Sequence, residues 1–391
     1  MKGTLLRKYC NLKDPTRKEN IYAQYKALRN SITNLKRQAK VEYYRKFFEL
    51  NKSNSKKIWK GIRSIVNINS NSQGHVKLLN DNGKFITDQK KIANSFNKYF
   101  VNVGPDIDKT IPKSIHNYQD YLSDLKINKT FFMSPTNPKE VFDIIASLDI
   151  NKSTGPNSIP VYILKVYNNF FSENLSKIIN ISFSTGVFPD LCKIAKLIPI
   201  FKKDNQLQCG NYRPISLLSV FSKIFEKVIY TRMYSFLEKN KLIYDHQFGF
   251  RANHSTNHAV INLTELIKSY RDSGNTAAGI FIDLQKAFDR VNHKILCGKL
   301  NYYGFRGKSL ELISSFLCGR KQFVSINGHN SSYLDITCGV PQGSTLGRLL
   351  FLIYINDLRY CLKYAVASHF ADDTCLLYAN KKLKSLETNL N

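Results

Sequence analysis

Two segments of this 391-residue chain carry carboxylates in a setting that metal-dependent chemistry needs. An apolar, strand-like run ends at Asp283, and a helix-like stretch follows it. The adjacent Asp372 and Asp373 lie between two apolar stretches, 366–370 and 374–378, which are expected to pair as a β-hairpin with both aspartates at its tip. Adjacent carboxylates in apolar surroundings repel each other and resist desolvation, and a bound cation relieves both effects.

If the strand that ends at Asp283 lies beside this hairpin, three carboxylates converge. Carboxylate oxygens favour Mg²⁺, and such a set suits two ions ~3.5–4 Å apart that clamp the attacking and leaving oxygens in phosphoryl transfer. The alternative is that Asp372 and Asp373 are only turn residues, which is common for aspartate. Taken alone, the Asp-Asp pair favours that alternative.

A glycine-rich segment lies between the two acidic segments. It reads Cys338-Gly-Val-Pro-Gln342-Gly-Ser-Thr-Leu-Gly-Arg348, and an apolar run predicted as a buried helix follows it. Glycines allow close backbone approach, and the amide of Gln342 offers both a donor and an acceptor to a base or sugar. Asp289, close after Asp283, is expected to order a helix start or a neighbouring basic side chain.

The elements that would position these residues follow a loop at 67–74 and a Pro/Asn-rich linker at 134–138. Before the loop, Asp14-Pro15 predicts a helix start. Between the two, a small hairpin (76–79 with 84–87) and a helix (88–103) are predicted, with an irregular stretch after the helix. After residue 138, helix-like and strand-like segments alternate to the end.

The charge of the chain narrows the classes of partner. Lys and Arg number 58 against 29 Asp and Glu, a net charge of +29, while 43% of residues are hydrophobic. The hydrophobic fraction excludes a disordered basic tail, and the charge makes nucleic acid the leading partner. Residues 1–66 hold 18 of the basic residues and 4 of the acidic ones. This segment is predicted to be either a solvated amphipathic or coiled-coil helix or a helix that follows a phosphate backbone.

The order of strand-Asp, Pro-Gln-Gly and Phe-Ala-Asp-Asp resembles the reverse transcriptase family. Asn211-Tyr-Arg-Pro-Ile-Ser-Leu-Leu and Gln247-Phe-Gly-Phe-Arg251 make the chain similar to its non-LTR (LINE-type) retrotransposon branch, over about residues 152–378. The resemblance implies an α+β fold: a right-hand polymerase palm, an antiparallel sheet backed by helices, with fingers. A basic helical region would precede it.

The implied domains are a connector (1–66), an N-terminal extension (67–150), fingers (151–276) and palm (277–391), with the reverse transcriptase domain overall at about 175–391. The chain is expected to be a fragment that lacks the family's endonuclease and thumb. In the family, proline usually stands where this chain has Arg348. Arginine at this position lacks the preset first turn that proline gives a helix, and its charge opposes the helix dipole, which together cost about 0.5–2 kcal/mol.

The resemblance also implies roles for individual residues. Catalysis and metal binding would belong to Asp283, Asp372 and Asp373, with two Mg²⁺ ions or Mn²⁺ as a substitute. The remaining assignments are nucleotide-binding Lys202, Arg213, Phe288 and Gln342, and template-binding Arg251. Phe288 would exclude a 2′-hydroxyl, and Lys202 and Arg213 would hold the triphosphate. The alternative for Arg251, Phe248 and Phe250 is packing of their own loop.

The expected function is RNA-directed DNA polymerase, with an RNA template, a DNA primer or target DNA, and deoxynucleotides as partners. The alternatives are a catalytically incompetent nucleic-acid-binding remnant and a group II intron maturase-like protein. No apolar run approaches the ~20 residues that cross a bilayer, and the N-terminus has no secretory signal, so no membrane partner and an intracellular location, nucleus or cytoplasm, are expected.

Overall fold

The N-terminal segment is helical, as its sequence predicts. The structure is a computed structural model, and it divides into two compact units, Met1–Gly74 and His75–Asn391. The residues it describes are 2–11, 14–52, 54–66, 76, 78–81, 83–112, 114–122, 127 and 129–390. The predicted loop at 67–74 lies outside them.

The first unit consists of three helices, α1 (Lys2–Asn11), α2 (Pro15–Leu50) and α3 (Ser55–Ile65). The predicted start of the long helix is confirmed. The Asp14 side chain accepts a hydrogen bond from the backbone N–H of Thr16 at 3.0 Å, and Pro15 occupies the first turn, where its missing N–H costs nothing. None of the residues of α2 is buried within the described chain, so its basic and aromatic side chains are available to a partner.

The second unit begins with the predicted hairpin, β1 (Leu79–Asp81) and β2 (Lys84–Ile86), and with α4 (Gln89–Thr110). The first strand begins at Leu79, later than the predicted residue 76, and it extends to Asp81. Asn80, predicted in the turn, lies in the strand, and its side chain accepts a hydrogen bond from the N–H of Gly83 at 2.8 Å, which closes a tighter turn. The prediction that α4 ends near residue 103 is wrong. The helix continues through Pro105, and Gly104 packs where a Cβ would lie 2.3 Å from the carbonyl oxygen of Asp289.

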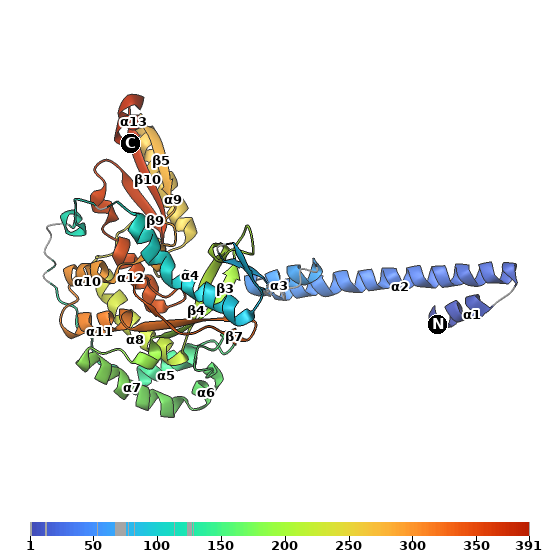
Figure 1. The fold of residues 1–391 in the computed structure, drawn as a ribbon. Helices are drawn as coiled ribbons and strands as arrows, with labels where there is room; N and C mark the ends of the chain where they lie inside the picture. Colours follow the sequence, from blue (N-terminus) through green and yellow to red (C-terminus); the bar gives the residue numbers. More distant parts are fainter. Residues whose placement is uncertain are drawn as a thin grey trace. The chain divides into compact units, whose positions relative to one another are not determined.

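A large helical core fills the middle of the second unit (Figure 1). Buried side chains of α8 and α12 pack together at its centre, so the apolar run after Arg348 is the buried helix that its sequence predicts. The helices are α5 (Pro138–Ser147), α6 (Val161–Val166), α7 (Asn168–Thr185), α8 (Val220–Lys239), α10 (His293–Tyr302), α11 (Lys308–Leu317) and α12 (Thr345–Ile355).

Five strands form a mixed sheet beside this core, in the order β4-β3-β6-β7 with β8 also paired to β6. β3 and β4 are antiparallel, whereas β3 and β6 run parallel. The pairing of β3 with β6 joins segments on either side of the predicted fingers–palm boundary at 276, and the division into those domains stays a prediction. The strands are β3 (Ile194–Phe201), β4 (Tyr212–Leu218), β6 (Arg320–Ile326), β7 (His329–Asn330) and β8 (Leu334–Ile336).

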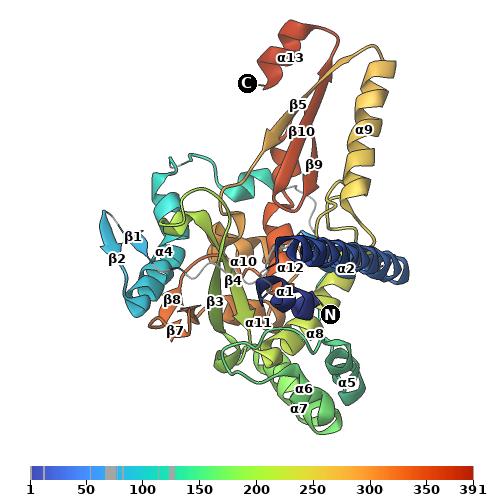
Figure 2. The ribbon, with the colours of Figure 1, turned by 90° about the vertical axis from the view of Figure 1, so that its right-hand side faces the viewer.

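A second sheet of three antiparallel strands carries the acidic segments. Its order is β5 (Thr276–Ile282), β10 (Asp373–Asn380) and β9 (Val366–Phe370), so the predicted hairpin and its neighbouring strand are both confirmed. α9 (Thr256–Asp272) packs along β5 and β9, and α13 (Leu383–Leu390) follows β10 (Figure 2). The predicted α+β class is confirmed, with the antiparallel-rich sheets expected of a polymerase palm.

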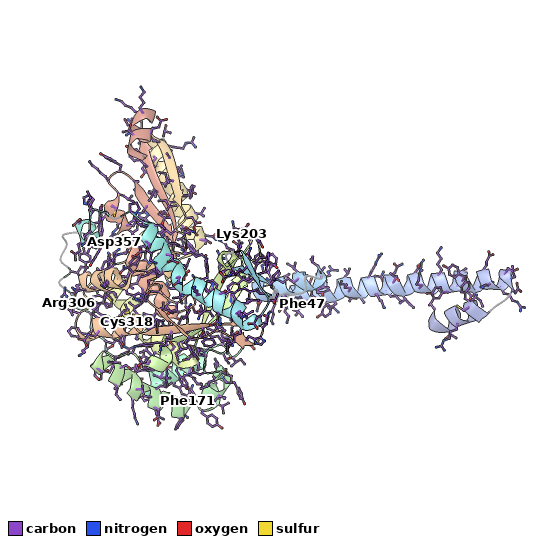
Figure 3. The ribbon with its side chains drawn as sticks, viewed as in Figure 1. Phe47, Phe171, Lys203, Arg306, Cys318 and Asp357 are labelled. Carbon is purple, nitrogen blue, oxygen red and sulfur yellow. The ribbon has the colours of Figure 1, made fainter. Side chains whose placement is uncertain are left out.

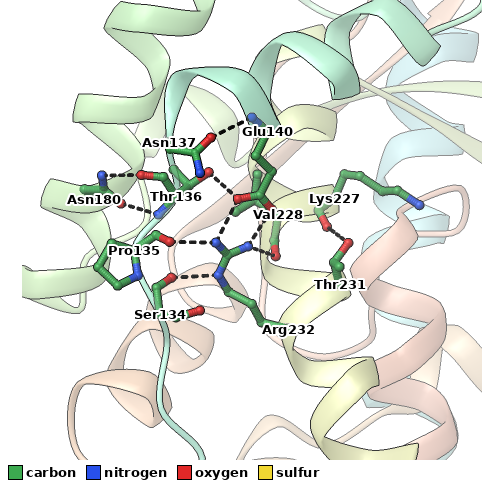
Figure 4. A network of polar contacts seen from close by, with 10 residues as sticks. All are labelled: Ser134, Pro135, Thr136, Asn137, Glu140, Asn180, Lys227, Val228, Thr231 and Arg232. Atoms are coloured by element: carbon green, nitrogen blue, oxygen red, sulfur yellow. Dashed lines mark hydrogen bonds and ion pairs between the residues drawn. The ribbon is translucent and has the colours of Figure 1, made fainter.

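Two ion pairs tie the helices together. Arg232 of α8 forms a two-pronged contact with Glu140 of α5, at 2.7 and 2.9 Å, and also donates to the carbonyls of Ser134 and Pro135 (Figure 4). It thereby anchors the chain that leads into α5. The second pair, Lys299 with Asp357 at 2.6 Å, is buried at the end of α12 (Figure 3).

Within the described residues, none of the helices is both long and apolar enough to span a membrane. Short 3₁₀ helices lie at Tyr118–Tyr121, Asp190–Cys192, Cys209–Asn211, Ala287–Arg290 and Leu358–Cys361.

Candidate functional site

The antiparallel register brings the three predicted aspartates to one end of the small sheet. Asp283 comes directly after β5, whose last residue, Ile282, pairs with Thr374 of β10. Asp373 is the first residue of β10, and Asp372 precedes it in the tight turn after β9. A left-handed Ala371, with φ of +60°, makes that turn possible. The end of β5 therefore meets the start of β10, which is the condition under which the three carboxylates converge.

The three carboxylates are close enough for the charges of two of them to act on the third. Burial raises the pKa of Asp372, and the negative charges of Asp373 and Asp283 raise it further. Arg213, from the other sheet, acts in the opposite direction. Asp283 and Asp373 are exposed, so a ligand can reach this end of the sheet.

The donor set suits a hard divalent cation, because carboxylate oxygens are its preferred ligands and a cation would relieve the repulsion at Asp372. In their present side-chain positions the aspartates do not form a finished site. Within the part of the chain that the structure describes, there is no group of three His, Cys, Asp or Glu side chains placed to hold a metal ion.

Two predicted cationic residues, Arg213 and Lys202, lie in or next to the mixed sheet, and the charge of Arg213 acts on Asp372. Arg213 is exposed on β4 opposite Ile200 of β3, and Lys202 follows β3, with its backbone N–H donating to the carbonyl of Asn211 at 2.9 Å. Burial lowers the pKa of Lys286, and the nearby positive charges of Lys202 and Arg213 lower it further. Both predicted basic residues therefore lie close enough to interact with Lys286, while Lys203 projects from the same loop (Figure 3).

Lys286 is the residue that sequence reasoning missed. It is half-buried three positions after Asp283, in the left-handed conformation with φ of +54°, and its ammonium lies 6.0 Å from the ring centre of Tyr99 in α4. A non-glycine residue in that conformation often marks a functional site. The sequence feature that could have identified Lys286 is its position three residues after Asp283, where the chain has to turn at the end of the strand.

Backbone hydrogen bonds hold the glycine-rich turn between the segment that follows β5 and strand β4. The N–H of Val340 donates to the carbonyl of Phe288, and the N–H of Gly339 donates to that of Val291, both at 2.8 Å. On the other side, the N–H of Ser216 in β4 donates to the carbonyl of Gln342 at 2.9 Å. The close approach predicted from the glycines is confirmed at Gly339, where φ is +84° and a Cβ would meet the Asp289 backbone at 2.9 Å.

The side chain of Gln342 points to a partner that was not predicted. Its amide nitrogen donates to the two carboxylate oxygens of Asp289, at 3.0 and 3.1 Å. Burial raises the pKa of Asp289 to about 6, against the lowering effects of Gln342 and of the positive charge of Lys286. Asp289 does not order the following helix, because Asn292 caps α10 instead.

Phe288 packs within a small aromatic cluster. Its ring stacks on Phe351 of α12 with centroids 4.5 Å apart and meets the ring of Phe250 edge-on at 6.0 Å. Phe250 is 38% exposed, in a left-handed conformation, and the guanidinium of Arg348 lies 5.6 Å from its ring centre. Phe248 is buried, as its packing alternative predicts.

Arg251 is occupied by protein partners. Its guanidinium makes two bonds of 2.9 Å to the Glu238 carboxylate and donates to the carbonyls of Tyr244 and Gln247. Only 8% of its side chain is exposed. This conformation fits the packing alternative, and the template contact stays a prediction.

Comparison with known proteins gives one family. Residues 200–391 match the family model described as reverse transcriptase (RNA-dependent DNA polymerase). The matched range contains both sheets' site residues, from Lys202 to Asp373.

Three relatives come from Drosophila melanogaster. The chain is 33% identical over 279 residues to the probable RNA-directed DNA polymerase from transposon BS, a match that covers 67% of this chain and 30% of the relative. It is 32% identical over 260 residues to the probable RNA-directed DNA polymerase from transposon X-element, with 64% and 28% covered. It is 30% identical over 266 residues to the RNA-directed DNA polymerase from mobile element jockey, with 66% and 29% covered. The matches thus span less than a third of each relative's length.

Proposed function

Since residues 200–391 match the model of the reverse transcriptase family, we propose that this chain contains the nucleotidyl-transfer site of a non-LTR retrotransposon RNA-directed DNA polymerase. In this reaction the 3′-hydroxyl of a DNA primer, paired to an RNA template, attacks the α-phosphate of a deoxynucleotide. A P–O bond forms to the primer, the bond to the β-phosphate breaks, and pyrophosphate leaves.

The register of the small sheet carries this proposal, because it joins the end of β5 to the start of β10. Asp283, Asp372 and Asp373 would hold divalent cations, which reverse transcriptases generally use. Two Mg²⁺ ions there would supply charge stabilisation to the attacking and leaving oxygens. The raised pKa of Asp372 supports the assignment, since the cause is burial together with two neighbouring carboxylates.

The triphosphate would be bound by Arg213 and Lys202, which lie in or next to the mixed sheet, together with Lys286 of the segment after β5. A guanidinium offers a planar set of donors that matches phosphate oxygens, which suits the exposed Arg213. Lys202 and Lys286 would add positive charge, and their mutual repulsion in the free protein would be relieved by the anion.

The aromatic and amide residues would set the position of the nucleotide. Phe288 is backed by the stacked ring of Phe351, so a sugar hydroxyl pressing on it could not displace it without disturbing the core. Gln342 would contact the nucleotide from the glycine-rich turn, which is hydrogen-bonded to β4 and to the segment that follows β5.

Primer extension tests the proposal. A DNA primer on an RNA template is incubated with deoxynucleotides and Mg²⁺, and wild type is compared with Asp372→Asn. Extension by Asp372→Asn is expected to fall at least about a hundredfold, because several kcal/mol of charge stabilisation is lost. The control is Asp143→Asn, which makes the same change in net charge at an exposed position on α5.

Equal extension by wild type and Asp372→Asn would reject the site. Template binding by wild type without Mg²⁺-dependent extension would instead favour the nucleic-acid-binding remnant.

A further inference from the structure

The carboxylate of Asp289 lies beside the proposed site without belonging to the three aspartates. Two of its neighbours are Lys286, whose charge acts on it, and Tyr99 of α4, on whose hydroxyl it acts. Gln342 supplies both hydrogen bonds that this carboxylate accepts within the described chain, through one amide nitrogen.

This contact is not needed to hold the backbone of the turn. Three backbone bonds already fix residues 339–342, two to the segment after Asp283 and one to β4. In addition, the ring nitrogen Nε2 of His293 lies 2.8 Å from the carbonyl oxygen of Gly339. What the Asp289 carboxylate adds is control of the Gln342 side chain.

An ionised carboxylate also fixes which way the amide faces. It can only accept hydrogen bonds, so it must meet the NH₂ end of Gln342, and the amide oxygen Oε1 then points away from it. A neutral side chain at 289 would leave both amide orientations open. Burying a carboxylate against one neutral donor is unfavourable, as the raised pKa of Asp289 shows, and a purely structural position would be served better by an apolar residue.

We infer that Asp289 is a positioning residue that sets the amide orientation of Gln342 and so presents its oxygen to the incoming nucleotide. This inference rests on the proposed function, because the nucleotide is what Gln342 would contact. Asp289 acts only through Gln342 and touches no substrate. The same segment, from Asp283 to Asp289, would then supply a metal ligand, a cation, the sugar-facing ring and the residue that orients the Gln342 amide.

A ligand-free measurement tests the contact itself. The protein is labelled with ¹⁵N-glutamine, and the side-chain NH₂ signal of Gln342 is identified by its loss in Gln342→Ala. That signal is expected to shift in Asp289→Asn and to stay in place in Asp143→Asn, which changes the net charge equally. An unchanged signal in Asp289→Asn would overturn the inference whatever the protein binds.

A double-mutant cycle tests the functional consequence. Binding of dTTP is measured with Mg²⁺ on a poly(rA) template whose oligo(dT) primer ends in a dideoxynucleotide, so that no bond forms. Asp289→Ala is expected to weaken dTTP binding about tenfold in wild type and by less than about twofold in the Gln342→Ala background. Equal weakening in both backgrounds, or none in wild type, would overturn it.

Two controls separate the possible failures. Melting temperatures are compared first, and if Asp289→Ala is unstable the isosteric Asp289→Asn replaces it in the cycle. If wild type itself does not bind dTTP, the proposed function fails and this inference fails with it. If wild type binds dTTP and the effects of the two substitutions on dTTP binding are additive, only the inference fails.

Discussion

Phe288 shows how one side chain can pack on the core and still border the proposed site. One face of its ring stacks on Phe351, which is buried, while its edge meets Phe250, which is partly exposed. The ring is therefore fixed by packing and still reaches the surface layer of the site. Side chains held in this way keep their position to within the small tolerance that selectivity requires.

Replacing Phe288 by Val is expected to relax the choice of sugar. The smaller side chain leaves space for a 2′-hydroxyl, so the preference for deoxynucleotides over ribonucleotides should fall at least about tenfold, which corresponds to about 1.4 kcal/mol. Incorporation of dATP and ATP by the two proteins measures this ratio. Phe85→Val, the same change at an exposed position on β2, is the control and should leave the ratio unchanged. An unchanged ratio in Phe288→Val would contradict the role.

The burial of His369 predicts that the hairpin of β9 and β10 loses stability in acid. It is buried, its Nδ1 lies 3.0 Å from the hydroxyl of Thr374, and burial lowers its pKa to about 4. A histidine whose pKa is depressed in the folded state takes up its proton more readily when unfolded, so stability is lost as pH falls from about 6.5 towards about 4.

His369→Gln removes this dependence. Between about pH 7 and about pH 4.5, the free energy of unfolding of wild type should fall by about 2–3 kcal/mol more than that of His369→Gln. Urea denaturation at a series of pH values measures it, with His329→Gln on the exposed strand β7 as control. Parallel pH profiles for wild type and His369→Gln would rule out this account of the acid sensitivity.

The helices and strands position the site through contacts between distant segments. Glu226 of α8 is fully buried and accepts hydrogen bonds from the hydroxyl of Ser344 and the N–H groups of Thr345 and Leu346, so it caps α12 just after the glycine-rich turn. Arg232 similarly binds the chain before α5. These contacts fix the turn and the helices around it.

The two-pronged contact between Arg232 and Glu140 predicts a clear effect on stability. Arg232→Lys keeps the charge but removes the planar set of donors that meets Glu140 and the carbonyls of Ser134, Pro135 and Val228. It should lower the free energy of unfolding by about 2–3 kcal/mol. Chemical denaturation measures this, and Arg306→Lys, at an exposed site with neutral partners, should cost less than about 0.5 kcal/mol. Equal stability of Arg232→Lys and wild type would show that the two-pronged contact contributes little to the free energy of unfolding.

Local sequence patterns predicted the elements that form from one continuous stretch of the chain. The strand that ends at Asp283, the hairpin that carries Asp372 and Asp373, and the buried helix after Arg348 all follow from hydrophobic runs and their interruptions. The partners of Gln342 and Arg251 did not follow, because they depend on tertiary packing across 53 and 13 residues. The continuation of α4 past Gly104 was missed for the same reason, since the helix is held there against the Asp289 carbonyl.

At the scale of the whole molecule, charge is unevenly placed. The chain has a net charge of +29, and residues 1–66 contribute 18 Lys and Arg against 4 Asp and Glu. None of the residues of α2 is buried within the described chain, so its cations are accessible to a phosphate backbone. Such binding is independent of sequence and weakens with salt because counterions are released.

Salt titration tests this part of the account. With six or more phosphates neutralised, affinity for an RNA–DNA hybrid should fall at least about a thousandfold between about 50 and 200 mM salt. Replacing Lys36, Arg37 and Lys40 of α2 by Gln should make that dependence shallower, by about one unit of slope for each phosphate that is no longer neutralised. The control replaces three basic residues of α8 and α9 in the second unit, Lys227, Lys239 and Lys268. An unchanged slope in the α2 variant would show that this helix does not bind the backbone.

The central claim is that Asp283, Asp372 and Asp373 hold divalent metal together, and it can be tested without polymerisation. Fe²⁺ is added in place of Mg²⁺, with ascorbate and hydrogen peroxide, and the sites where the chain is cut are mapped by mass spectrometry. We predict cuts close to Asp283 and close to Asp372 in wild type, suppressed by excess Mg²⁺ and lost in Asp372→Asn but kept in Asp143→Asn. Cuts elsewhere, or the same cuts in Asp372→Asn, would contradict the claim.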